Sequence, residues 1–264
     1  MQDCKPDLTP IDPNNRLKAI EVDEQKTNTT AYQQIIRSLM YSVTGTRPDL
    51  AYTITHFSQF NSSPSITHLT SAKRVLQYLQ GTNNGHLFYP WNNQLKMTVY
   101  MDASYGNCLD TRQSFSGYIF QLGNATICWR CQKQRSVATS TCEAEYMALA
   151  MMTKHHLWLK CGSHMLLKID ILTALSCDRN ATIDVTYNPK LNDQSKHNDV
   201  AYHFAREQIN QWTVSVMYVP SEENLVHICT KGMTRYVNDH LCAKIFGSKW
   251  EGVLKIAKYL HFSY

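Results

Sequence analysis

Between residues 97 and 219 the sequence alternates between short strand-like runs and helical patterns, in an order that few folds satisfy. Three runs rich in aromatic and β-branched residues come first, and the Gly123-Asn124 pair predicts a two-residue hairpin between the second and the third. Hairpin-linked strands followed by crossover helices imply a mixed sheet with helices packed on it. We therefore expect an α/β fold with a mixed five-stranded sheet flanked by helices. The expected elements are strands over 97–103, 115–122 and 125–130, a helix over 140–166, a strand over 171–177, a helix over 199–211 and a strand over 213–219.

A small helical unit is expected before the sheet. Residues 1–30 are polar and contain three prolines, which predicts an extended lead-in. Residues 31–90 carry three helical patterns, with Thr30 and Ser65 as caps of the first and third helices and Pro48 at the start of the second. The remainder from Glu222 onward has a helical pattern and ends in a basic tail.

Composition sets broad limits on function. The chain has 264 residues, a net charge of +5 and a pI near 8.6, values that are compatible with a polyanionic partner without requiring one. We expect the Lys73-Arg74 pair to be a solvated helix face rather than a phosphate contact. The N-terminus has no apolar leader, and no stretch approaches the roughly 18 apolar residues of a membrane span. We therefore expect a protein that is neither secreted nor membrane-bound.

Cysteine usage indicates a reducing compartment. Nine cysteines are scattered through core-like segments, as is typical of reduced thiols in the cytoplasm or nucleus. Cys128 and Cys131 have the spacing of a metal-binding pair, but they lie in an expected strand, where a separation of three puts the side chains on opposite faces. Both are predicted to be buried cysteines.

Three carboxylates are the candidate functional residues. Asp102 and Asp178 each close an apolar, strand-like run, and Glu145 lies in the first turns of the helix that begins near Ser140. Alone, each aspartate could start a turn, and Glu145 could be a surface residue. Together they predict a site of hard oxygen ligands suited to Mg²⁺.

The two glutamates at this helix start need separate explanations. Ser140 and Glu143 have the spacing of a capping box, in which Glu143 bonds back to the N-cap amide. Glu145 is about 200° further round the helix, one turn before Leu149, on a partly apolar stripe where a solvated carboxylate is not expected.

At this point the sequence resembles the C-terminal part of the Pol polyprotein of copia-type retrotransposons, meaning the end of the reverse transcriptase followed by its ribonuclease H domain. The resemblance covers about residues 1–247, and so many matches in one order are highly specific. The matching stretches include Thr46-Arg47-Pro48-Asp49-Leu50-Ala51, Ala72-Lys73-Arg74-Val75-Leu76-Gln77-Tyr78-Leu79, Ser116-Gly117-Tyr118, Glu143-Ala144-Glu145-Tyr146-Met147-Ala148-Leu149, Tyr202-His203-Phe204-Ala205-Arg206-Glu207, Tyr218-Val219-Pro220 and Thr230-Lys231.

The resemblance implies a nuclease site. Asp102, Glu145 and Asp178 fall on three of the ribonuclease H metal-binding carboxylates, which implies hydrolysis of the RNA strand of an RNA–DNA hybrid with two Mg²⁺ ions, or Mn²⁺ in their place. His227 stands at the fourth position, where the family has aspartate, so this position is degraded. Imidazole brings no negative charge and suits Mg²⁺ poorly. We therefore expect weakened or lost cleavage.

The resemblance also implies a division of the chain. Residues 31–90 correspond to a helical thumb or connection remnant, 95–232 to the ribonuclease H-like domain, and 233–264 to a C-terminal helical tail. The sequence has no polymerase, protease or integrase motif, and a reverse transcriptase polypeptide is a further expected partner. The alternative hypothesis is a non-catalytic transposon remnant that folds and binds nucleic acid.

Overall fold

The computed structural model describes residues 4–14, 17–90, 96–168, 173–178, 207–208 and 214–247. The predicted helix over 199–211 lies outside the described residues except for 207 and 208, which are helical. The predicted tail beyond residue 247 lies outside them as well. In the part of the chain that is described, no helix is both long and apolar enough to cross a bilayer.

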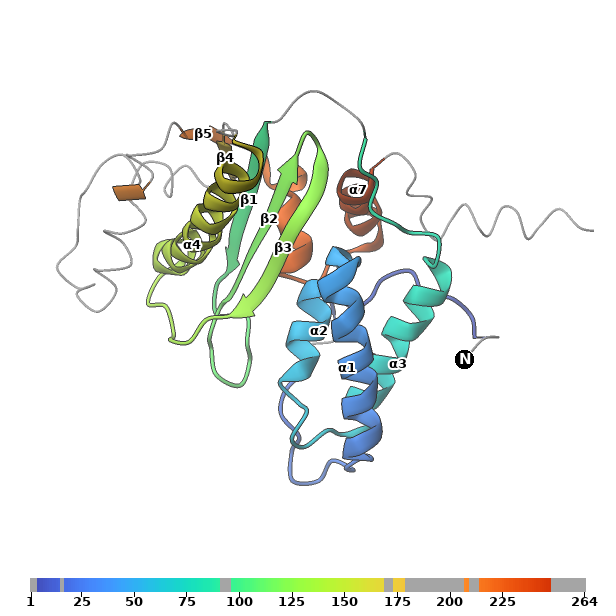
Figure 1. Cartoon of the computed structure of the whole chain (residues 1–264). Coiled ribbons are helices and arrows are strands. Elements are labelled where there is room, and N and C mark those ends of the chain that lie inside the picture. Colours follow the sequence, from blue (N-terminus) through green and yellow to red (C-terminus); the bar gives the residue numbers. More distant parts are fainter. Residues whose placement is uncertain are drawn as a thin grey trace, which may run out of the picture.

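The predicted mixed five-stranded sheet is confirmed (Figure 1). Its strands stand in the order β3-β2-β1-β4-β5, with antiparallel pairing of β1–β2 and β2–β3 and parallel pairing of β1–β4 and β4–β5. Gly123 and Asn124 form the predicted hairpin turn, with φ of 55° and 68°, as a two-residue turn with two left-handed positions requires. The strands are β1 Met97–Ser104, β2 Phe115–Leu122, β3 Ala125–Lys133, β4 Thr173–Cys177 and β5 Val214–Tyr218.

One face of the sheet packs against the long helix α4, Thr141–Leu167 (Figure 1). Alternate residues of β1 and β2, such as Met101 and Phe120, point to this face and pack with Ala144, Ala148 and other residues of α4. Because α4 joins β3 to β4, which lie on opposite sides of β1 in the sheet, it is the crossover that the parallel β1–β4 pairing needs.

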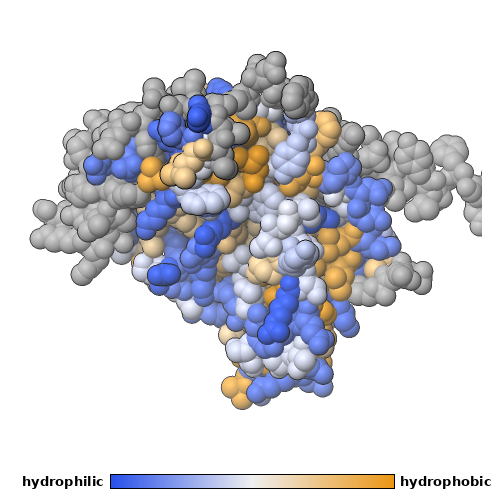
Figure 2. All heavy atoms as spheres, in the orientation of Figure 1, coloured by the Kyte–Doolittle hydropathy of each residue, from blue (hydrophilic) through white to orange (hydrophobic). Residues whose placement is uncertain are grey.

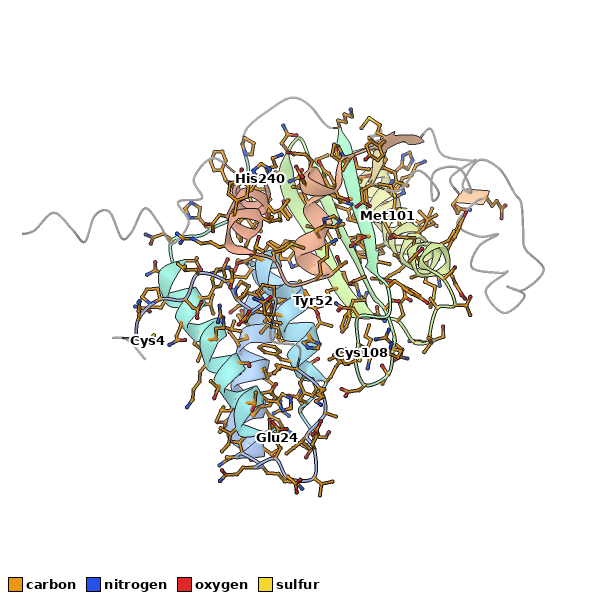
Figure 3. All side chains as sticks on the ribbon, turned by 180° about the vertical axis from the view of Figure 1, so that it is seen from behind. Cys4, Glu24, Tyr52, Met101, Cys108 and His240 are labelled. Atoms are coloured by element: carbon orange, nitrogen blue, oxygen red, sulfur yellow. The ribbon has the colours of Figure 1, made fainter. Side chains whose placement is uncertain are left out.

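The opposite face is covered by the short helix η3, Leu225–Cys229, the helix α7, Arg235–Phe246, and the N-terminal helices. Seen from behind in Figure 3, η3 lies between α7, which carries His240, and β1, which carries Met101. The helices from both ends of the chain share one hydrophobic core with β2. The helical unit predicted before the sheet therefore packs directly on it, and the domain limits expected from the resemblance stay a prediction.

The N-terminal unit has the predicted helices, with one cap corrected. The helix α1 is capped by Asn28, whose side chain accepts from the Ala31 amide, and not by Thr30, which lies inside the helix. Ser65 caps α3 as predicted, and His68 completes a capping box. The elements are α1 Thr29–Gly45, η1 Pro48–Leu50, α2 Ala51–Ser58 and α3 Ile66–Gly81.

The lead-in is held against the rest of the molecule. Ile11 and Leu17 are buried in the core that the N-terminal helices share. Arg74 forms an ion pair with Asp7 at 2.8 Å and donates to the Thr9 hydroxyl at 3.0 Å. The prediction that the Lys73-Arg74 pair is a solvated face is therefore wrong for Arg74, because the preceding chain folds back over α3. No local sequence signal marks such a long-range contact.

The two cysteines of the Cys128-x-x-Cys131 spacing lie on opposite sides of the sheet, as predicted, but each is partly rather than fully buried. Cys128 packs with the core on the α4 face, and Cys131 packs with the core on the other face. Burial raises the pKa of Cys128 to about 11 and that of Cys131 to about 12. Both are therefore protonated thiols at neutral pH.

A buried ion pair joins the N-terminal helices to α7. Arg47 donates two hydrogen bonds to the Asp49 carboxylate, at 2.9 and 2.7 Å, and a third to the Thr82 hydroxyl at 2.7 Å. The Tyr78 hydroxyl donates to Asp49 at 2.9 Å and accepts from Asn238 of α7 at 3.3 Å. Tyr78 of α3 thus contacts the buried Asp49 carboxylate of η1 directly, and Asn238 links α7 to it through Tyr78.

Two buried histidines predict loss of stability in acid. His56 and His156 are 5% and 2% exposed, and burial lowers the pKa of each from 6.5 to about 4. Between about pH 6.5 and pH 4 both histidines are protonated in the unfolded chain but not in the folded chain. Their contribution to the free energy of unfolding is therefore fully present above pH 6.5 and is lost as the pH falls towards 4. At pH 5 each histidine should cost about 2 kcal/mol of unfolding free energy. Urea denaturation should show that the free energy of unfolding falls between pH 7 and pH 4. This fall should be smaller in His56→Gln/His156→Gln and unchanged in the exposed control His86→Gln.

Candidate metal centre

Asp102 lies in the central strand β1 and is buried. Its neighbours Met101 and Ala103 point to the α4 face, so the alternation of a strand turns Asp102 to the face covered by η3. There its Oδ2 atom accepts a hydrogen bond from the Thr230 hydroxyl at 2.5 Å. The strand therefore presents a buried carboxylate to the segment that follows β5.

Asp178 directly follows β4, the parallel neighbour of β1. Its Oδ2 atom accepts from the Ser221 hydroxyl at 2.5 Å and is 3.1 Å from His227 Nε2. Its Oδ1 atom is buried and has no hydrogen-bond partner among the described residues. Burial by itself raises the pKa of this carboxyl, but the hydrogen bonds from His227 and Ser221 outweigh it and hold the pKa well below its usual range.

His227 stands between the two aspartates. It lies in η3, and its Nε2 atom is 3.1 Å from Asp178 Oδ2 and 3.9 Å from Asp102 Oδ2. One potential ligand atom from each of the three side chains lies within 4.8 Å of the other two. The structure thus brings together three of the four residues singled out in the sequence.

Glu145 is outside this group of three. It is fully buried near the start of α4, next to Ala144 and Ala148 of the core on the α4 face. Its expected role as a third carboxylate ligand stays a prediction. Glu143 has a different position, because its carboxylate accepts from the amide and the hydroxyl of Thr139, both at 2.6 Å. Ser140 caps the helix as predicted, by accepting from the Glu143 amide, but the backbone amide that Glu143 accepts from is that of Thr139, one residue before the predicted N-cap amide.

Gly117 allows η3 to approach the sheet closely enough to complete the group. It pairs with Asp102 across β1 and β2. A Cβ atom at Gly117 would lie 2.7 Å from Cγ2 of Thr230 and 3.1 Å from atoms of Cys229 and Val226. Only a residue without a side chain therefore lets Thr230 reach Asp102.

Gly117→Ala should consequently destabilise the protein by about 1–3 kcal/mol, because the added methyl group overfills a packed contact. Gly162→Ala is the matched control, since a methyl group added there would have nothing within 4 Å of it and α4 continues through this position. That change should stabilise the helix by up to about 1 kcal/mol. Chemical denaturation should show a lower free energy of unfolding for Gly117→Ala and an equal or higher one for Gly162→Ala. Equal changes in the two variants would contradict the packing argument.

The donor set fits a divalent cation. Two carboxylates and an imidazole are within reach of one point, and the unpartnered Asp178 Oδ1 is the kind of buried acceptor that a cation satisfies. Mixed oxygen and nitrogen donors suit Mn²⁺ or Zn²⁺ better than Mg²⁺, which prefers oxygen. Thr230 and Ser221, which orient the two aspartates, had no role assigned from the sequence, although Thr230-Lys231 is one of its matching stretches.

Comparison with known proteins gives relatives over nearly the whole chain, although no protein-family model matches it. A retrovirus-related Pol polyprotein from transposon RE1 of Arabidopsis thaliana is 32% identical over 244 residues, covering 92% of this chain and 16% of that protein. The corresponding protein from transposon TNT 1-94 of Nicotiana tabacum is 31% identical, covering 94% and 19%. A secreted RxLR effector protein of Plasmopara viticola is 41% identical over 128 residues, covering 48% of this chain and 90% of that protein.

Among solved structures, the N-terminal RNase H domain of a Mycobacterium tuberculosis protein, solved as a fusion with maltose binding protein, aligns with a TM-score of 0.40 and 12% identity. It covers 56% of this chain and 96% of that one. LC11-RNase H1 in complex with an RNA/DNA hybrid aligns with the same TM-score and identity, covering 51% and 94%.

The described part of the chain is thus an α/β fold, in which a mixed five-stranded sheet, its crossover helix and the flanking helices bring together an aspartate of β1 and the aspartate that follows β4. The chain spans less than a fifth of the length of the two Pol polyproteins described above. Over 92–94% of its residues it is similar to part of these retrovirus-related Pol polyproteins from copia-type transposons.

Proposed function

We propose that this chain is a nuclease module that binds RNA–DNA hybrids and hydrolyses the RNA strand slowly, with a divalent cation held by Asp102, Asp178 and His227. The observation that carries the proposal is the convergence of a buried and a partly buried aspartate from adjacent parallel strands, the second of them with an unpartnered oxygen. When bound, the cation would supply an activated water and would stabilise the leaving oxygen.

Slow turnover follows from the composition of the group. A two-cation site needs negative charge on both sides of the reacting phosphate, and the group of three supplies only two carboxylates. His227 also uses its Nε2 atom in a hydrogen bond to Asp178. Binding of a second Mg²⁺ would depend on Glu145, which lies outside the group of three. Because the group includes a nitrogen donor, which suits Mn²⁺ better than Mg²⁺, Mn²⁺ should support more activity than Mg²⁺.

The test uses the purified chain and an end-labelled RNA–DNA hybrid, with Mn²⁺ and with Mg²⁺. Asp102→Asn should reduce cleavage by at least about a hundredfold, because it removes a carboxylate that no neighbour replaces. Asp23→Asn, at an exposed position of the lead-in, is the control with the same loss of charge and should cleave like the unmodified chain. Cleavage that survives Asp102→Asn would assign the activity to another site or to a contaminant.

The rival function is a non-catalytic remnant that binds nucleic acid. The observation that favours it is the position of His227, whose Nε2 atom lies 3.1 Å from Asp178 and 3.9 Å from Asp102, so that the imidazole itself can hold the two carboxylates together. This hypothesis predicts no cleavage at any metal concentration together with salt-dependent binding of nucleic acid.

We place this function inside the cell, in the cytoplasm or nucleus, and expect a reverse transcriptase polypeptide as the partner that supplies the hybrid. All nine cysteines are free thiols, as is usual in a reducing compartment. Co-purification with a tagged reverse transcriptase fragment of the same family tests the partnership.

A further inference from the structure

A second feature lies on the α4 face of the sheet, away from the group of Asp102, Asp178 and His227. A groove of about 660 Å³ lies between α4 and the neighbouring strands β2 and β3, the last of which is an edge strand of the sheet (Figure 1). Among the described residues that line it there is no aspartate or glutamate. We call this feature the β3–α4 groove.

Four cationic side chains line the β3–α4 groove. Arg130 and Lys133 come from β3, Arg135 follows that strand, and Lys154 faces them from α4. Arg130, Arg135 and Lys154 are exposed, and none of the four forms an ion pair with a described carboxylate. On the face shown in Figure 2, hydrophilic residues cover much of the surface where α4 lies beside the sheet. A cluster of unpaired cations without acidic neighbours fits a chain of phosphates.

An aromatic platform borders the same groove. Trp158 is 68% exposed and lies one helical turn after Lys154 on α4. Its indole ring is 5.4 Å from the ring of His155, which stacks on Tyr118 at 5.2 Å with an angle of 28°. A bond of 3.0 Å between His155 Nε2 and Cys128 Sγ further holds the imidazole in place. An exposed indole supported in this way offers a flat surface to a planar ligand.

We propose that the β3–α4 groove binds a single strand of nucleic acid, with phosphates at the four cations and a base stacked on Trp158. Phosphate contacts alone would suit a duplex equally well, but the bases of a duplex are stacked on each other and cannot cover an exposed indole. Cationic grooves with aromatic platforms are the usual means of holding single strands. The choice of nucleic acid as the ligand rests on the proposed function, but binding of a single strand in the groove does not require the protein to cleave it.

The position of the groove connects it to the sheet residues near the metal centre. Gln134, which lines the groove, donates to the Ser116 hydroxyl at 2.8 Å and to the Ala144 carbonyl at 2.9 Å. Ser116 pairs with Ala103, the residue after Asp102, and Ala144 precedes Glu145. One end of the groove is therefore next to the start of α4, and a single strand lying in it would extend along α4 from there.

The experiment measures fluorescence anisotropy of a labelled 12-nucleotide single strand with the full chain in EDTA, at several salt concentrations, with a blunt duplex of equal length as competitor. Trp158→Ala should weaken single-strand binding by roughly 5- to 150-fold, the range for loss of one stacked base. Arg135→Ala/Lys154→Ala should reduce the salt slope by about 1.4. Tyr41→Ala and Lys73→Ala, exposed residues of the N-terminal helices, are the controls.

Single-strand binding that falls in the groove variants but not in the controls supports the inference, whether or not the protein cleaves hybrids. Loss of cleavage in Asp102→Asn with unchanged single-strand affinity would separate the two proposals. Equal affinity of Trp158→Ala and the unmodified chain, or a duplex that competes as well as the single strand, would overturn it. Circular dichroism confirms that each variant is folded, and all the residues substituted in the groove and its controls are exposed.

Discussion

Replacing Arg47 with leucine is expected to lower the free energy of unfolding by about 3–5 kcal/mol, the usual cost of leaving one partner of a buried ion pair without the other. The side chains of Arg47 and Asp49 are 6% and 0% exposed. Without the guanidinium group, the Asp49 carboxylate would stay buried with the Tyr78 hydroxyl as its remaining donor described above. Denaturation by guanidinium chloride measures the loss.

Two comparisons make this prediction specific. Arg37→Leu, on the exposed side of α1, removes the same charge and should change the unfolding free energy by less than about 0.5 kcal/mol. The double variant Arg47→Leu/Asp49→Leu should be less destabilised than the sum of the single variants, because no isolated charge remains. An Arg47→Leu protein as stable as Arg37→Leu would show that the ion pair does not hold η1, α3 and α7 together.

Replacing His227 with aspartate is expected to raise the affinity for Mg²⁺ and the rate of hybrid cleavage, each by at least about tenfold. The change adds a carboxylate beside Asp102 and Asp178 and removes the imidazole that bridges them. Without metal, three neighbouring carboxylates repel one another, so the melting temperature should fall. With Mg²⁺ it should rise by more than in the unmodified chain.

Thermal melting with and without Mg²⁺, together with the hybrid cleavage assay, measures both parts of this prediction. His86→Asp, at an exposed loop position, makes the same change of charge far from η3 in the sequence and should have little effect on either measurement. If His227→Asp responds to Mg²⁺ no more than His86→Asp does, the missing carboxylate at position 227 is not what weakens metal binding and cleavage. The non-catalytic hypothesis would then gain support.

The fold could be predicted where the sequence carries local signals. The hairpin at Gly123-Asn124 and the caps at Ser65 and Ser140 were predicted because turns and helix ends depend on a few adjacent residues. Asn28 was missed in favour of Thr30 because both residue types cap helices and the choice depends on where the chain enters. The contact of Arg74 with Asp7 could not be predicted, since nothing near either residue marks a partner more than 60 positions away.

The proximity of the two aspartates in the candidate site was predictable, and the contacts that arrange them were not. Asp102 and Asp178 end apolar runs that become neighbouring parallel strands, so the strand order alone brings them together. Thr230 and Gly117 matter only because η3 packs closely on β2, a tertiary contact with no local pattern. The position of Glu145 likewise depends on how α4 lies on the sheet, which helical periodicity does not determine.

The central claim is that Asp102, Asp178 and His227 form one divalent cation site, and calorimetric titration of the purified chain with Mn²⁺ tests it most directly. We predict saturable binding with one dominant site per chain, lost in Asp178→Asn and retained in Asp23→Asn. Binding of equal strength in Asp178→Asn, or no saturable binding by the unmodified chain, would contradict the assignment.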